Sequence, residues 1–427
     1  MKCFFNFILI LIFTFIFNES KANTLLNSLT EAYLNNSKLN AERAYVRSVN
    51  EDKKEAFSEF MPTITISGYV SEQENTNPGD DTNFQPSEQS MTIEQKIFQG
   101  FGGVANLKKK KYEYLLAEFK LKKIEQEILL SAAEAHIDLL LNKKKVNINK
   151  INIDLLERQV ETDSVRLEKG EINLTDLAQS EASLAGAKAK LIGAKNALIV
   201  SEVNFEKIIG FRPVDDIEEI QQTNIWLPEN LAQAYRISND ENPDLQIALL
   251  EFEQSKQEVL IAGSDLSPSA TLSYKIAEQE DFSSTVQDRT QQTVTATATW
   301  PLFTGGSNLF NLREAQELRN NKELLLEDSK KIISTDVASA WSNYQSSKSV
   351  LESIESQVKA AEIANEGITL EYESGNNRTT LEVIQSRAIL LNSRVDLITS
   401  KRDFLISQFK LLSSIGRLTE KQLNLKK

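Results

Sequence analysis

The chain has 427 residues and a formal net charge of −13 at pH 7, with 41% hydrophobic and 26% charged residues. This balance is ordinary for a folded protein and excludes an intrinsically disordered one. The acidic excess argues against nucleic acid as a partner, because binding the phosphate backbone requires a basic surface.

The N-terminus has the features of an export signal. Lys2 gives a positive start, residues 4–17 are almost wholly apolar, and residues 20–22 place small side chains where a signal peptidase cleaves. A membrane anchor is the alternative, but a spanning helix needs about 20 apolar residues. We therefore expect residues 1–22 to be a signal peptide and Asn23 to start the mature chain.

Cysteine usage and hydropathy narrow the remaining classes. The only cysteine, Cys3, lies inside the expected signal, so the mature chain would have no disulfide and no thiol chemistry. No long apolar segment follows the signal. The sequence is therefore that of a periplasmic protein, a secreted protein, or an outer-membrane protein that crosses the bilayer as β-strands.

Two parts of the chain carry the period-two alternation of apolar and polar residues that predicts strands. Polar stretches rich in turn residues should link the strands within each part. The expected strands are 63–67 and, more weakly, 91–94 in the first part, and 270–274 and 293–300 in the second, with linking loops at 75–90 and 278–292.

Four antiparallel strands are too few to close a membrane barrel, because the smallest have about eight. Several chains would have to share one barrel. A small soluble sheet at the end of a coiled coil is the alternative, and the export signal favours the membrane. In a barrel, lipid would contact Ile64, Ile66, Val294, Ala296 and Ala298, and water would contact Thr63, Thr65, Thr293 and Thr295.

A very long helix should follow each strand pair. Residues 104–169 and 307–366 contain neither glycine nor proline and are rich in good helix formers. A helix of about 66 residues would be roughly 100 Å long, which predicts a coiled coil or a helical barrel. A second helix rich in small residues should follow a glycine-containing turn, at 180–208 and 386–415, and so complete a helical hairpin.

The two halves of the chain match at an offset of 205 or 206 residues. Residues 97–100 (IFQG) match 302–305 (LFTG), and residues 168–170 (EKG) match 373–375 (ESG). This constant offset predicts an internal duplication. The expected parts are the signal at 1–22, a first repeat at 23–212, an equatorial linker at 213–239, and a second repeat at 240–427, each repeat holding a helix, a β-hairpin, a long helix and a second helix.

This order of elements, repeated twice, resembles the TolC family of outer-membrane channels. The resemblance covers nearly the whole chain after the signal. Its marks are residues 242–245 (NPDL), 300–306 (WPLFTGG) and 169–177 (KGEINLTDL). Residues 179–184 (QSEASL) and 97–101 (IFQGF) resemble the branch that serves type I secretion.

The resemblance implies an α+β membrane protein that acts as a homotrimer. Twelve strands, four per chain, would form a barrel in outer-membrane lipid, and a long α-helical barrel would continue it across the periplasm. A periplasmic adaptor (membrane fusion) protein and an inner-membrane transporter would dock at the far end. The resemblance leaves the cargo open among secreted proteins, drugs and metabolites, and it implies neither catalysis nor a cofactor.

A periplasmic coiled-coil adaptor and a soluble scaffold of an export complex are the alternatives. Adaptors also use a helical hairpin, but they usually have one, together with a lipoyl-like β domain. This chain has two equal copies of its hairpin, which favours the channel.

The resemblance also assigns residues to a periplasmic constriction at the turns between the long and second helices. Thr175 and Asp176 match the constriction in the first half, and Tyr372 and Arg378 match it in the second. Arg378 lies one place later than in the family pattern, because this turn carries an extra residue. Simple helix capping by residues 175 and 176 is the alternative, and the two roles are compatible.

An inner pore ring is the second assigned site. Glu382 matches the first carboxylate of the family's ring, whereas Gln385 stands where the second carboxylate usually lies. Three copies of Glu382 around a narrow mouth would favour cations. A bond between Arg378 and a carboxylate of a neighbouring hairpin would help to keep the mouth shut.

Metal and nucleotide chemistry have little support in the sequence. His136 is the only histidine, so with no mature cysteine we expect no zinc site and no nucleophile–base pair. Residues 100–103 (GFGG) imitate a nucleotide-binding loop, but no dinucleotide fold surrounds them. We expect a strand-to-helix bend there, and no catalytic, cofactor or metal site anywhere.

Overall fold

The computed structural model describes residues 24–77, 80–213, 218, 225–283, 286–374 and 378–425. The expected signal peptide at 1–22, its cleavage before Asn23, ten residues of the linker at 213–239 and the turn residue Gly375 lie outside these residues. The described part forms two compact units. The helical unit takes residues up to 40, 123–242 and from 334 onward, and the sheet unit takes 41–122 and 243–333.

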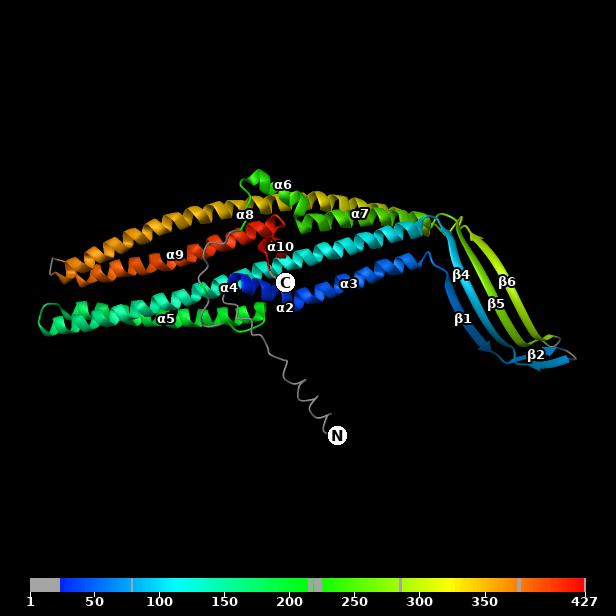
Figure 1. Ribbon diagram of the computed structural model, residues 1–427, viewed down its shortest axis with the longest axis horizontal. Helices are drawn as coiled ribbons and strands as arrows, with labels where there is room; N and C mark the ends of the chain where they lie inside the picture. Colours follow the sequence, from blue (N-terminus) through cyan, green and yellow to red (C-terminus); the bar gives the residue numbers. More distant parts are fainter. Residues whose placement is uncertain are drawn as a thin grey trace, which may run out of the picture. The chain divides into compact units, whose positions relative to one another are not determined.

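Helices dominate the chain, and their order is shown in Figure 1. The elements are α2 (Leu25–Asn35), α3 (Ser37–Ser58), β1 (Thr63–Val70), β2 (Gln73–Asn77), β3 (Asp80–Phe84), β4 (Ser87–Gln99), α4 (Gly102–Glu168), α5 (Leu174–Ile209), α6 (Leu231–Glu241), α7 (Pro243–Ser264), β5 (Ser269–Ser283), β6 (Val286–Thr299), α8 (Ser307–Glu373), α9 (Thr380–Ser414) and α10 (Glu420–Leu423).

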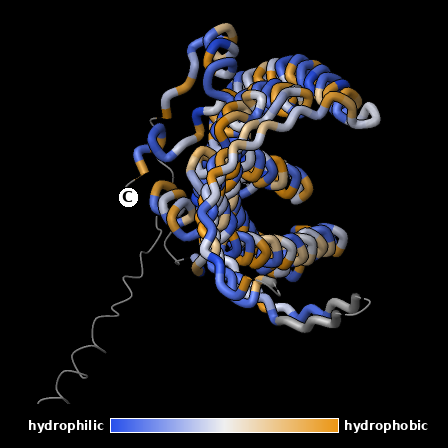
Figure 2. The backbone as a smooth tube through the Cα atoms, turned by 90° about the vertical axis from the view of Figure 1, so that its right-hand side faces the viewer, coloured by the Kyte–Doolittle hydropathy of each residue, from blue (hydrophilic) through white to orange (hydrophobic). Residues whose placement is uncertain are grey.

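The two long helices predicted from the sequence are present. Helices α4 and α8 each have 67 residues, and each contributes residues to both units. Figure 2 shows hydrophobic and hydrophilic residues interleaved along the helices. Within the described residues, no helix combines the length and the apolar character that a membrane span requires.

The sheet unit contains one antiparallel sheet of four strands in the order β1-β4-β5-β6. The central pairing joins β4 from the first half of the chain to β5 from the second. A second ladder, β2 with β3, lies where the sequence predicted only a loop at 75–90. These strands are rich in Asn, Asp, Thr and Gln, so they carry no alternation of apolar and polar residues that could have revealed them.

The register gives the four-stranded sheet one apolar face and one polar face. Side chains of directly paired residues point to the same face, and this holds across all four strands. One row is Ile64, Ile93, Tyr274 and Val294, and the next apolar row contains Ile66, Met91 and Ile276. The row between them points the opposite way and contains Thr65, Thr92, Lys275 and Thr293.

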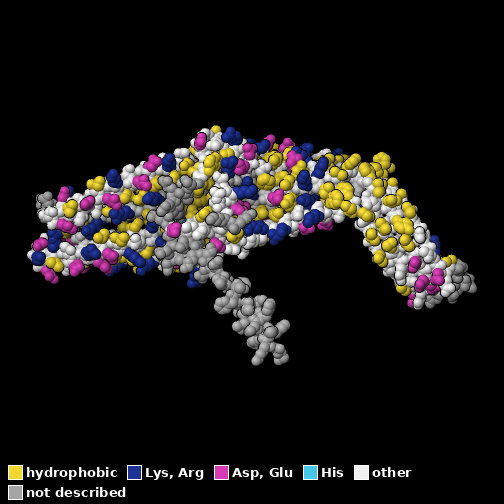
Figure 3. Space-filling model, in the orientation of Figure 1, with side chains coloured by type: hydrophobic (Ala, Val, Ile, Leu, Met, Phe, Trp, Pro, Cys, Tyr) yellow, Lys and Arg dark blue, Asp and Glu magenta, His cyan; other side chains and the backbone are white. Residues whose placement is uncertain are grey.

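Among the described residues of the single chain, none covers the apolar face. Ile66 is 81% exposed and Val294 is 69% exposed. In Figure 3, hydrophobic side chains spread over the strands and over the bend where the strands meet the helices. Exposed aromatic residues mark that bend, among them Phe101, Trp300 and Phe303. A patch of this size needs a partner or lipid.

A glycine makes the strand-to-helix bend between β4 and α4 possible. Gly100 has a φ of +58°, and a Cβ at this position would lie 2.5 Å from the Cβ of Ser267. Only glycine fits this backbone conformation and this close approach. Residues 100–103 therefore form a bend, as their sequence predicted, between a strand and a helix.

In the helical unit, α9 lies beside α8 along a seam of small residues. Buried serines recur on α9 every seven residues, at Ser386, Ser393, Ser400 and Ser407. Ser407 Oγ lies 2.8 Å from Ser347 Oγ, Gln357 Nε2 donates to Ser393 Oγ at 3.1 Å, and Ser386 Oγ donates to Asn365 Oδ1 at 3.1 Å. A period of seven keeps one face of a helix turned toward its neighbour.

Candidate functional site at the hairpin turns

The turn of the first hairpin is organised by a capping box at the start of α5. Asn173 caps the helix, Asp176 N donates to Asn173 Oδ1 at 3.0 Å, and Asn173 N donates to Asp176 Oδ2 at 3.3 Å. Thr175 is exposed. Gly170 supports the turn with a φ of +76°. Asp176 therefore caps the helix in the single chain, while Thr175 is free to meet a neighbour.

The turn of the second hairpin repeats this arrangement. Thr379 caps α9, and Glu382 Oε2 accepts hydrogen bonds from Thr379 N at 2.8 Å and Thr379 Oγ1 at 3.1 Å. The Thr379 backbone N–H, followed by the Arg378 guanidinium, lowers the pKa of Glu382. Gln385 lies one turn further along α9 and is exposed. Glu382 is thus an ionised carboxylate held at the tip of the hairpin.

Arg378 binds two carboxylates of its own hairpin. Its Nε donates to Glu371 Oε2 at 2.6 Å, and its Nη1 donates to Glu382 Oε1 at 2.9 Å. These two bonds raise the pKa of Arg378. The resemblance predicts a bond between Arg378 and a carboxylate of a neighbouring hairpin. Among the described residues of the single chain, its ion pairs stay within the second hairpin and do not include Asp176.

Tyr372 connects the two hairpins through a carboxylate that the sequence analysis did not identify. Tyr372 Oη donates to Asp163 Oδ1 at 3.2 Å and lies 3.1 Å from Thr380 Oγ1. The Tyr372 hydroxyl has one proton, so Thr380 donates to it. Ser180 Oγ donates to Asp163 Oδ2 at 2.5 Å, and Gln159 Nε2 donates to Asp163 Oδ1 at 2.9 Å.

Asp163 is therefore the centre of a four-helix polar cluster, which we define as Gln159, Asp163, Ser180, Tyr372 and Thr380. These residues come from α4, α5, α8 and α9. Asp163 has no exposed surface, and Tyr372 is 8% exposed. A buried carboxylate is stable only while its oxygens accept hydrogen bonds. The loss of any one donor therefore destabilises the whole cluster.

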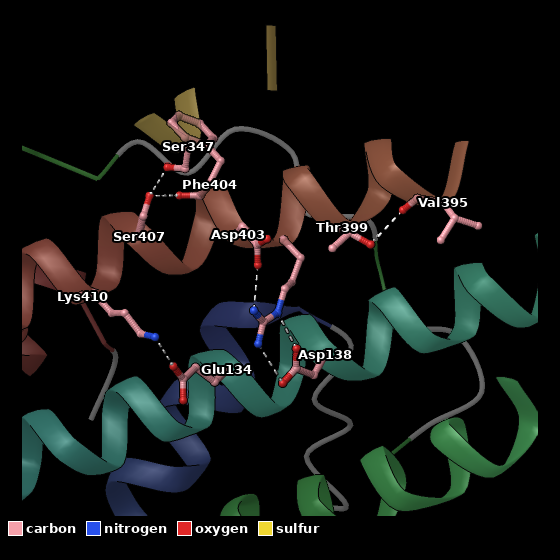
Figure 4. Close-up of polar contacts among 10 residues, drawn as sticks. Glu134, Asp138, Ser347, Val395, Thr399, Asp403, Phe404, Ser407 and Lys410 are labelled. Atoms are coloured by element: carbon pink, nitrogen blue, oxygen red, sulfur yellow. Dashed lines mark hydrogen bonds and ion pairs between the residues drawn. The ribbon is translucent and has the colours of Figure 1, made fainter. Parts of the chain in front are cut away.

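Further ion pairs join α4 to α9 midway along the hairpins (Figure 4). Arg402 Nε donates to Asp138 Oδ1 at 2.7 Å, and Lys410 Nζ lies 3.3 Å from Glu134 Oε1. Arg402 also binds Asp403 on its own helix, at 2.7 Å. The Asp138 carboxylate raises the pKa of Arg402. The contact between the two hairpins is thus polar both at the turns and at mid-length.

His136 is packed in the interior of the helical unit. Its Nδ1 lies 2.8 Å from Ser28 Oγ, its ring contacts Phe205, and it has no exposed surface. Burial, followed by the charge of Lys143, lowers its pKa to about 4. Among the described residues, no group of three or more His, Cys, Asp or Glu side chains could hold a metal ion.

The arrangement of long hairpins and a small sheet is shared with known proteins. The chain is 25% identical to the outer membrane efflux protein BepC of Brucella suis biovar 1, over 95% of this chain and 88% of BepC. It is 20% identical to the outer membrane protein TolC of Escherichia coli K12, over 95% of this chain and 84% of TolC.

A solved structure shows the same fold. The CmeC outer membrane channel of Campylobacter jejuni superposes with a TM-score of 0.82 over 92% of this chain and 86% of CmeC, at 13% sequence identity. CmeC is thus an outer membrane channel, and BepC is an outer membrane efflux protein. The family model for outer membrane efflux proteins matches residues 29–211 and again residues 234–417. The chain therefore belongs to the outer membrane efflux protein family, the TolC family of outer-membrane channels.

Proposed function

We propose that three copies of the chain form one channel-tunnel that exports substrates across the outer membrane. Four strands from each copy would close a 12-stranded barrel in the bilayer, and the helical hairpins would form an α-helical barrel in the periplasm. The observation that carries this proposal is the four-stranded sheet, which has one apolar face, one polar face and two open edges.

The open edges call for a neighbouring chain. Strands β1 and β6 lie at the two edges of the sheet. The outer edge of β6, a strand of 14 residues, pairs with no other strand among those described. An exposed edge of this length invites pairing with another strand. In a bilayer every backbone group must be paired, which requires a closed barrel. Pairing β6 of one copy with β1 of the next would close the sheet after three copies and place the apolar rows toward lipid.

An internal duplication accounts for the equal hairpins. The proposed repeats, 23–212 and 240–427, are each matched by the family model, and their long helices have the same length. Each compact unit takes segments from both proposed repeats, so the proposed repeats do not coincide with the compact units of the fold.

The turns would form the gate at the periplasmic end. Tyr372 would hold the two hairpins of one copy together through Asp163, while Thr175, Asp176 and Arg378 would meet a neighbouring copy. Glu382 would contribute the charge of the inner pore ring, with Gln385 as its neutral neighbour. A periplasmic adaptor and an inner-membrane transporter would open the gate when they dock at these turns.

The cargo we propose is a protein secreted by the type I route. The support is the resemblance of residues 179–184 and 97–101 to that branch of the family. Efflux of small molecules such as drugs is the second candidate, which the similarity to the efflux protein BepC favours. Family membership argues against the adaptor and scaffold alternatives.

Cysteine scanning of β6 tests the barrel. The only cysteine of the chain is Cys3, in the proposed signal, so single cysteines at 293–298 would be labelled without background. We expect a water-soluble maleimide to label cysteines at Thr293, Thr295 and Thr297 in outer-membrane preparations. Cysteines at the intervening apolar positions should stay unlabelled, because they would face lipid.

Unheated gel electrophoresis of the same variants should show a trimer that dissociates on boiling. Equal labelling at all six positions would contradict the barrel. A monomer in outer-membrane fractions would contradict the shared assembly.

A further inference from the structure

A cavity of about 330 Å³ lies between the two hairpins of the helical unit, among α4, α8 and α9. Its apolar wall includes Ile148, Leu155, Leu370, Leu390 and Leu391. Its remaining lining is polar and includes two arginines. Cavities of this size and mixed character are typical of small-molecule sites.

Two residues that line this cavity carry buried polar atoms without a hydrogen-bond partner among the described residues. They are Arg387, through Nη1, and Thr369, through Oγ1. Burial lowers the pKa of Arg387, against the opposing charges of Glu373 and Asp163. A buried guanidinium nitrogen without an acceptor is unfavourable, and a carboxylate can supply that acceptor.

The other charged residues of the lining do not accept a hydrogen bond from Arg387 Nη1. Arg394 already binds Glu362, with its Nη2 2.8 Å from Glu362 Oε1. Glu366 is the acidic residue of the lining, and it is exposed. The cavity therefore combines an apolar wall with one cationic donor and one hydroxyl that lack an acceptor.

We propose that this cavity binds a small organic anion with an unbranched apolar tail, such as a medium-chain fatty acid. The carboxylate binds Arg387 and Thr369, and the tail lies against the leucines and isoleucines. The walls come from both hairpins, so a bound anion links them and stabilises their contact. This inference goes beyond the proposed function, because export through a central tunnel does not require it.

Equilibrium dialysis with radiolabelled decanoate tests the proposal. The mature protein is placed in nanodiscs of zwitterionic phosphatidylcholine, and labelled decan-1-ol serves as the neutral comparison. We expect saturable binding of about one decanoate per chain and only unsaturable partitioning of the alcohol. Decanoate should also raise the temperature of thermal unfolding.

Variants show whether the binding uses this cavity. Arg387→Gln should weaken decanoate binding by at least about tenfold, and Arg387→Lys should retain most of it. Thr369→Val keeps the volume of the side chain and should cause a smaller loss of decanoate binding. This variant keeps the test decisive if Arg387→Gln folds poorly. Arg313→Gln, an exposed arginine elsewhere on α8, is the matched control and should bind like wild type.

Absence of saturable decanoate binding would overturn the proposal. A side chain of a second copy that fills the cavity would give this result. Equal affinity of wild type, Arg387→Gln and Thr369→Val would also overturn it. Decanol binding as tightly as decanoate would show a purely apolar site and would contradict the assigned role of Arg387.

Discussion

Asp163 shows how one buried carboxylate can hold four helices. It accepts hydrogen bonds from Ser180, Gln159 and Tyr372, and Tyr372 in turn accepts one from Thr380. Each of these hydrogen bonds contributes about 1 kcal/mol to stability. Breaking one costs more than this, because it leaves a buried polar group without a partner. The cluster is therefore a candidate for the part of the gate that acts within one copy.

Tyr372→Phe and Arg378→Ser test the gate at the residue scale. The first removes the hydroxyl that binds Asp163, and the second removes the ion pairs of the second turn. A loss of about 1.4 kcal/mol would shift the closed-to-open equilibrium about tenfold. We expect a higher single-channel conductance in planar bilayers for both variants. Tyr344→Phe, a matched change far from the turns, should conduct like wild type, and wild-type conductance in all three would refute the assignment.

His136 should make the stability of the protein depend on pH. Its pKa of about 4 in the folded state lies below the ordinary value of 6.5, so the unfolded chain binds the proton more readily. The stabilisation is present above pH 6.5 and falls by about 3 kcal/mol as the pH drops to 4. Between pH 7.5 and pH 5, wild type should lose more thermal stability than His136→Gln. An identical loss in both proteins would show that His136 is not protonated on unfolding.

At the scale of elements, the serine seam sets how closely α9 approaches α8. On α5 the buried small residues Ser180, Ala187 and Ser201 lie seven and fourteen residues apart. Side chains of this size leave no volume between the helix backbones for a larger residue. The seam therefore explains why the second helix of each hairpin is rich in small residues.

Ser393→Leu tests the seam. Ser393 is 1% exposed, so a leucine would overpack the contact with α8 and destabilise the hairpin by about 1–3 kcal/mol. Ser393→Ala removes only the bond from Gln357 and should cost about 1 kcal/mol. Circular dichroism during heating measures both. The control is Asn392→Leu, at an exposed position of the single chain, and the idea fails if Ser393→Leu melts no earlier than this control.

The sequence predicted the long helices well because absence of glycine and proline over some 60 residues leaves few other structures. The start of the second helix in each hairpin was predicted less accurately. Helix α5 begins at Leu174 and not near Ser180, since the capping box of Asn173 and Asp176 starts the helix one and a half turns earlier. Gly367 lies inside α8, although the glycine-free run of the sequence ends just before it.

At the scale of the whole molecule, contacts between the two halves could not be predicted from local patterns. Tyr372 was identified through the resemblance, but Asp163 lies 209 residues away and follows no sequence motif. The pairing of β4 with β5 likewise joins strands about 180 residues apart. Such partners depend on the fold, and a single sequence carries no signal for them beyond their polarity.

Assembly around a threefold axis would turn a single acidic residue into a ring. Three Glu382 carboxylates in a narrow mouth would favour cations, although Arg378 offsets part of each charge. We expect weak block of single-channel current by a trivalent cation in wild type, and stronger block in Gln385→Asp. Glu382→Gln keeps the capping box but removes the charge, so block and cation preference should disappear.

Asp176→Asn is the comparison at the first turn, since Asp176 holds the equivalent capping position of the first hairpin. If Glu382→Gln leaves block and ion selectivity unchanged, Glu382 lies outside the pore. If Asp176→Asn has the same effect as Glu382→Gln, the ring is not specific to the second hairpin.

The pairing of β4 with β5 also fixes the order in which the chain can fold. Synthesis runs from the N-terminus, so β1 and β4 exist for roughly 10 to 40 seconds before β5 is made. A two-stranded hairpin is only marginally stable alone, and closing a loop of this length is slow. The first half must therefore wait with one edge of β4 unpaired, and it depends on protection from edge-to-edge aggregation until the second half arrives.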